Sequence, residues 1–151
     1  MHILKTLSAA ACALLALAAI GAATPAQAQQ EPHYLAALSE LRTARDYIQS
    51  DERPQFKGER HHAVDEINKA IAEIKHAAWD DGKQTKYAQS QGAANAWTPM
   101  HQAEHFLDGA RAHVAQGVDT PANTGLRDRA LMHIDEAERT IGNIIHQVGS
   151  N

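Results

Sequence analysis

Hydrophobic residues recur every three or four positions in four segments of the chain, with polar residues between them. This spacing places the hydrophobic side chains on one face of an α-helix. It predicts helices over residues 34–49, 59–78, 99–117 and 126–148. The residues expected to face inward are Tyr34, Leu38, Leu41 and Ile48, then Val64, Ile67, Ile71, Ile74 and Ala78, and finally Leu131, Ile134, Ile141 and Ile145. Few residues alternate as they would in a strand, so the predicted fold class is all-α.

The two halves of this pattern are a repeat. Residues 58–70 recur in type as residues 125–137, at an offset of 67, and the preceding helices match at an offset of 66. A single helical hairpin cannot bury its own hydrophobic face, so two hairpins must pack together. We therefore expect one domain over residues 29–151, an antiparallel four-helix bundle built from two repeated helical hairpins.

The boundaries of the repeat divide this domain into a hairpin at 33–78, a linker at 79–98 and a second hairpin at 99–148. The linker is longer than most helix connections. We expect it to cross the end of the bundle, with Trp79 or Trp97 against the core. A dimer that swaps hairpins through this linker is the alternative to a monomer.

Residues 1–28 have the pattern of a signal peptide. Lys5 is the only charged residue among them, an apolar run follows from Ala9 to Ala23, and the segment ends in Ala26-Gln27-Ala28. Signal peptidase cleaves after such an Ala-x-Ala sequence. The run is shorter than the ~20 residues that a membrane span requires. We therefore predict cleavage after Ala28, export to the periplasm and no membrane span in the mature protein.

Charge and composition exclude several functions. Loss of Lys5 with the signal peptide changes the net charge from −4 to −5, and no basic stripe remains to bind nucleic acid. The single cysteine, Cys12, leaves with the signal peptide, so the exported domain has no disulfide. No nucleophile–base arrangement, P-loop or dinucleotide motif is present. We therefore expect a protein that is not an enzyme.

Histidine is unusually frequent, because nine of the ten histidines lie after residue 28. Histidine is the commonest metal ligand in proteins. His101 and His105 are four residues apart and therefore share a helix face. Between them, Glu104 is expected at a core position level with Glu138 of the last helix. The adjacent core layer is expected to contain Arg45, Val64, Arg111 and Leu131.

Two facing carboxylates cannot both stay ionised inside a bundle without a counter-charge. Three arrangements of Glu104 and Glu138 would resolve this conflict. In the first, they form an ion-pair network with Arg45 and Arg111. In the second, they share a metal ion with His101 and His105, and in the third they are hydrated at an open end of the bundle.

A second candidate metal site lies on the outer face of the 59–78 helix, where His61 and Asp65, and His62 and Glu66, are each four residues apart. Imidazole and carboxylate pairs suit Cu(II), Ni(II) or Zn(II). A buried di-iron centre is excluded, because the helix register places His62 and His76 on the outer face. No haem is expected, because the chain has no Cys-x-x-Cys-His sequence.

Three segments together are similar to a family of small exported bacterial helical proteins of uncharacterised function: 34–45, 67–83 and 125–137. This resemblance implies one helical domain and export, and assigns no site. The sequences at 61–66 and 133–137 are faintly similar to small periplasmic metal-binding proteins. Those proteins have a histidine in each heptad, whereas this chain does not.

Two functions follow as hypotheses. The first is a non-catalytic periplasmic protein that binds divalent transition metal through His101, Glu104, His105 and Glu138, and through His61, His62, Asp65 and Glu66. The second is a structural or protein-interaction module of the cell envelope that needs no cofactor.

Overall fold

The computed structural model describes residues 25–80, 98–117, 121 and 124–150, and all of its regular structure is helical. The helices are α1 (Pro25–Ser50), α2 (Lys57–Asp80), α3 (Pro99–Gln116) and α4 (Leu126–Gly149), with a short 3₁₀ turn, η1 (Pro54–Phe56), before α2. The prediction of an all-helical chain with four helices is confirmed. Most of the predicted signal peptide and of the linker, including Trp97, lies outside the described residues.

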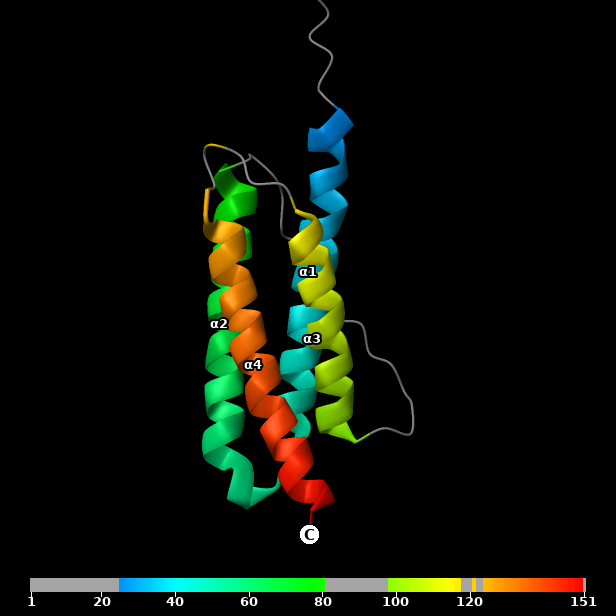
Figure 1. Cartoon of the computed structure of the whole chain (residues 1–151), viewed down its shortest axis with the longest axis vertical. Coiled ribbons are helices and arrows are strands. Elements are labelled where there is room, and N and C mark those ends of the chain that lie inside the picture. The colour runs from blue at the N-terminus through cyan, green and yellow to red at the C-terminus, as the bar shows by residue number, and fades with distance from the viewer. Residues whose placement is uncertain (1–24, 81–97, 118–120, 122–123, 151) are drawn as a thin grey trace, which may run out of the picture.

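The four helices lie side by side. In Figure 1, α1 and α4 run downward, whereas α2 and α3 run upward. The most extensive packing joins α1 to α3 and α2 to α4, and the contacts between α3 and α4 and between α1 and α2 are smaller. Each helix therefore makes its most extensive contact with the repeat-equivalent helix, which is the helix at the same position in the other unit of the repeat. The two helices of each such pair run in opposite directions. In the same view α2 ends at the top and α3 begins at the bottom.

Alanines make this close packing possible. Each helix carries alanines seven residues apart, and all of them are fully or almost fully buried: Ala37 and Ala44, then Ala63, Ala70 and Ala77, then Ala103 and Ala110, and finally Ala130 and Ala137. A larger buried residue follows most of these alanines after four positions: Leu41, Ile48, Ile67, Ile74, Leu107, Val114, Ile134 and Ile141. The methyl side chains let two helices approach, and the larger side chains fill the remaining space.

The predicted core register was wrong in part. Val64 and Leu131, expected in the core, are partly exposed, and Arg111 is exposed. On α3 the interior side chains include Gln102 and Ala103, and Glu104 is only half-buried. The buried stripe is centred on the alanines because the helix pairs are closest there. The expected core position of Glu104 is therefore corrected to a position beside the core.

The first helix begins earlier than predicted. The pattern placed its start at Tyr34, after Pro32, but α1 begins at Pro25 and continues through Pro32. Most residues between the two prolines are good helix formers. None of the helices in the described residues is both long enough and apolar enough to cross a membrane.

Replacing an interior alanine with leucine should destabilise the protein. Ala70 is completely buried, so Ala70→Leu must force α2 away from its neighbours at a cost of roughly 1–3 kcal/mol in the free energy of unfolding. Ala72 of the same helix is exposed, and Ala72→Leu should change stability little. Urea unfolding of both variants measures the difference, and equal stability of the two variants would contradict this account of the helix packing.

Candidate functional site

A set of polar residues on α2 and α4 forms charge contacts that join the two helices, in addition to the separate ion pair of Arg129 with Glu73. The set comprises two carboxylates, two histidines and two basic residues, and we call it the α2/α4 seam: His62, Glu66, Lys69, His133, Glu136 and Arg139. The buried alanines of α2 and α4 lie between the two helices, and the seam lies beside them.

The inner half of the seam joins Glu66 to His133. His133 Nδ1 lies 2.7 Å from Glu66 Oε2, and Lys69 Nζ lies 2.6 Å from Glu66 Oε1. The side chains of Glu66 and His133 are only 8% and 16% exposed. Burial by itself raises the pKa of Glu66, but the hydrogen bonds from Lys69 and His133 outweigh it, and the pKa lies below its usual value. Glu66 is therefore an ionised carboxylate with a partner on each oxygen.

The outer half of the seam joins His62 to Glu136. His62 Nε2 lies 2.9 Å from Glu136 Oε1, and Arg139 Nε donates to Glu136 Oε2 at 3.0 Å. The hydrogen bond from Arg139, and then that from His62, lowers the pKa of Glu136 to about 2. This pair is more open to water than the inner pair, since the side chains of His62 and Glu136 are 49% and 32% exposed.

The inner pair has a special place in the repeat. Glu66 and His133 are separated by the repeat offset of 67, so they are equivalent positions of the two units. The helices that carry these two residues, α2 and α4, run in opposite directions. The contact between Glu66 and His133 therefore joins two residues at the same position of the repeat on two antiparallel helices.

The first predicted metal site does not form as one group. His101 is exposed, and its Nδ1 lies 2.7 Å from Thr98 Oγ1 at the start of α3. His105 acts electrostatically on Glu40 of α1, which places it toward a different helix. Glu104 instead acts on Glu138 of α4. The two histidines therefore have partners other than Glu104 and Glu138, whereas the two carboxylates act on each other.

Glu138 is the half-buried carboxylate of α4 that faces α3. Burial, followed by the charges of Asp108 and Asp135, raises its pKa to about 7, with Arg111 opposing and Glu104 adding to the rise. Its Oε1 is buried and has no hydrogen-bond partner in the described part of the chain. Carboxylates therefore do gather between α3 and α4.

Of the three arrangements considered for Glu104 and Glu138, the ion-pair network is present only as an electrostatic effect between Arg111 and Glu138. Arg111 donates to Asp135 at 2.6 Å, and Arg45 donates to Asn68 of α2 at 3.0 Å. Neither arginine forms a hydrogen bond to Glu104 or Glu138 among the described residues. The two arginines lie outside the core, because alanines occupy the buried positions between the helices.

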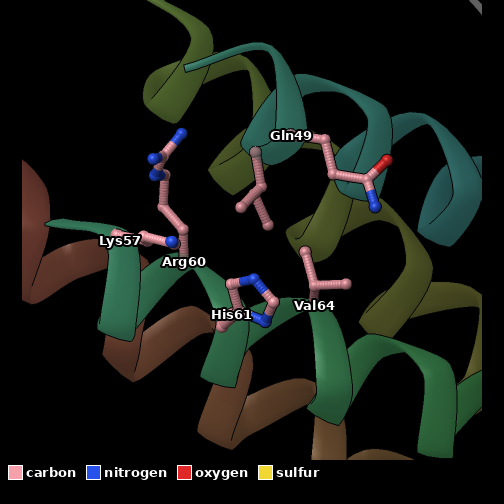
Figure 2. Close-up of a pocket in the computed structure, with 6 residues that line it drawn as sticks. Gln49, Lys57, Arg60, His61 and Val64 are labelled. Atoms are coloured by element: carbon pink, nitrogen blue, oxygen red, sulfur yellow. The ribbon is translucent and has the colours of Figure 1, made fainter. Parts of the chain in front are cut away.

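The second predicted site is also divided. His62 and Glu66 turn toward α4 and belong to the α2/α4 seam, whereas Asp65 is exposed. His61 lies on another side of α2, where it lines a cavity with residues of α1 (Figure 2). In the described ranges, no group of three or more His, Cys, Asp or Glu side chains has the arrangement of a metal centre.

Sequence reasoning missed His133 and Glu136. No histidine or carboxylate lies four residues from His133, so the spacing within its own helix gives it no partner. Its partner is on another helix, and the pattern within one helix cannot reveal that. The repeat offset that relates His133 to Glu66 was the available signal.

Comparisons with protein-family models, with curated proteins and with solved structures found no match for this chain.

The raised pKa of Glu138 predicts a pH-dependent stability. A carboxyl group whose pKa is raised by folding stabilises the fold below its unfolded pKa, near 4.5, and this contribution is lost as the pH rises through about 7. Glu138→Gln should therefore match the wild type at pH 4.5 and be more stable at pH 8, by about 1 kcal/mol once solvent screening is considered. Urea unfolding at both pH values, with Glu52→Gln as an exposed control, measures this difference. A Glu138→Gln variant with no gain at pH 8 would contradict the assignment.

Proposed function

We propose that this protein is an exported, non-catalytic antiparallel four-helix bundle of two repeated hairpins that binds a divalent transition metal ion at the α2/α4 seam. The observation that carries the proposal is the presence of two imidazole–carboxylate pairs next to each other on the same two helices. His62 bonds to Glu136 at 2.9 Å, and His133 bonds to Glu66 at 2.7 Å.

The spacing along each helix suits a shared ion. His62 and Glu66 are four residues apart on α2, and His133 and Glu136 are three apart on α4, so each helix offers one nitrogen and one oxygen ligand from a single face. Two imidazoles and two carboxylates are a ligand set for Cu(II), Ni(II) or Zn(II). The two carboxylate charges would balance the charge of the ion.

The seam side chains are not arranged as a metal centre as they stand. Metal uptake would require them to turn toward a shared ion and to exchange existing bonds for new ones. In the metal-free protein Lys69 and Arg139 neutralise the two carboxylates, and their side chains are 56% and 61% exposed. Both can turn into water when an ion takes their place. This exchange reduces the affinity, so the site is expected to release its ion readily.

Export is part of the same proposal, and the helix boundaries are compatible with it. Pro32 lies inside α1 when the helix begins at Pro25. Proline is poorly tolerated in a helix interior but is favoured in the first turn. Cleavage after Ala28 would leave Pro32 near the new start of the helix.

A second function, a structural or interaction module of the cell envelope without a cofactor, is favoured by the hydrogen bonds themselves. Because each seam carboxylate already has a basic partner and a histidine partner, the seam can act as a clamp between α2 and α4. On this alternative the histidines contribute stability and no ligand is bound.

Calorimetric titration of the purified protein with Zn(II), Cu(II) and Ni(II) at pH 7.5 tests the metal proposal. One saturable site is expected, and the double variant His62→Ala, His133→Ala should lose at least ~100-fold in affinity, because even outer-shell partners contribute on the order of 10–100-fold. The matched control is His101→Ala, His105→Ala, which should bind like the wild type. Binding should also weaken below roughly pH 6, where imidazole becomes protonated.

Each alternative has its own signature in this experiment. If the wild type shows no saturable binding, the metal proposal is wrong. If His62→Ala, His133→Ala then lowers the melting temperature of the metal-free protein far more than the control does, the clamp explains the seam. Equal metal affinity of the two double variants would place the ion elsewhere.

A further inference from the structure

A cavity of about 230 Å³ lies where α1 is followed by α2, on a different side of α2 from the seam (Figure 2). Figure 2 shows Gln49 of α1 opposite the α2 residues Lys57, Arg60, His61 and Val64, which line the cavity with it. None of the six lining residues is acidic, and three carry or can acquire a positive charge; the six are Ile48, Gln49, Lys57, Arg60, His61 and Val64.

Arg60 supplies an unused hydrogen-bond donor. Its Nε is buried and has no hydrogen-bond partner in the described part of the chain. A buried donor without an acceptor is unfavourable, so an acceptor that reached it would be bound with a gain in free energy. Asp51 interacts with Arg60 electrostatically, but its carboxylate is already occupied by Arg53, whose Nε donates to it at 2.9 Å. The guanidinium of Arg60 is therefore not neutralised by a bonded carboxylate.

The other lining residues define what kind of group the cavity accepts. Lys57 is exposed at the rim and adds a second positive charge, and His61 adds a third when it is protonated. Ile48 is fully buried and Val64 is half-buried, so they provide an apolar wall. The volume is below the roughly 300–1,000 Å³ of pockets for drug-sized ligands, which limits the ligand to the size of a small metabolite.

We infer that this cavity binds a small organic oxyanion, a carboxylate or a phosphate monoester that carries a compact apolar group. The oxyanion accepts hydrogen bonds from Arg60 and Lys57, and the apolar group lies against Ile48 and Val64. Arginine and lysine are the usual donors to both kinds of oxyanion. The cavity shares no residue with the α2/α4 seam, so this site is independent of metal binding.

NMR titration of the metal-free protein tests the inference, with the Nε–H signal of Arg60 as the reporter. The probes are benzoate, phenyl phosphate, inorganic phosphate and the neutral benzamide. Benzoate or phenyl phosphate should shift the signal saturably and bind at least about tenfold more tightly than benzamide, because a charged hydrogen bond is stronger than a neutral one. Whichever of the two binds more tightly identifies the oxyanion.

Variants distinguish binding in this cavity from nonspecific attraction by surface charge. Arg60→Gln should weaken the tighter probe at least about tenfold, and the exposed Lys57→Gln should weaken it by a smaller factor. The matched control, Arg111→Gln on α3, should bind like the wild type. The backbone spectrum of each variant shows whether it folds. If Arg60→Gln does not fold, the affinity of Lys57→Gln tests the inference.

Three outcomes would overturn the inference. Benzamide that binds as tightly as benzoate would mean that the cavity recognises only apolar surface. Inorganic phosphate that binds as tightly as phenyl phosphate would mean that only surface charge is involved. Probe affinities that are the same in the wild type and in a folded Arg60→Gln or Lys57→Gln variant would show that these residues do not bind the anion.

Discussion

The close approach of repeat-equivalent helices is the constraint on which the rest of the structure depends. Alanines seven residues apart are completely buried at positions such as Ala44, Ala70, Ala110 and Ala137. A methyl group at the interface allows two helices to pack more closely than leucine would, and a larger aliphatic side chain one turn later fills the gap. The two units of the repeat therefore bury their hydrophobic faces mainly against each other, α1 on α3 and α2 on α4.

This narrow interior determines where the polar residues lie. Side chains too large or too polar for the alanine rows are placed at the edges of each helix pair, where they reach the facing helix. Glu66 meets His133 in this way between α2 and α4, and Glu40 lies close to Gly109 between α1 and α3. A Cβ at position 109 would lie only 2.7 Å from Glu40 Oε1, so glycine permits the contact. Two of the histidines, His62 and His133, thus join α2 to α4. A metal ion at the seam would join the same two helices.

The sequence predicted the number and class of the helices because the hydrophobic spacing is a property of each segment alone. It predicted the core register only in part, and of the candidate site only the α2 residues His62 and Glu66, because both depend on which helices face each other. The predicted hydrophobic stripe of α2 included Val64, although Ala63 beside it is completely buried and Val64 is only partly buried. Glu104 was expected inside because the repeat register placed it at a core position, and the contact of His133 was not predicted because its partner is on another helix. Knowing that equivalent helices pair would have indicated that contact, since the repeat offset relates Glu66 to His133 directly.

Measuring which helices touch in solution tests this account most directly. In a methyl-labelled sample, nuclear Overhauser contacts report pairs of methyl groups that lie close together. The account predicts strong contacts between the methyl groups of α1 and α3, including those of Leu41 and Leu107, and between those of α2 and α4, including Ile67 and Ile134, because these helix pairs are the most closely packed. Contacts that instead join mainly α1 to α2 and α3 to α4 would contradict it, and the α2/α4 seam would then not exist.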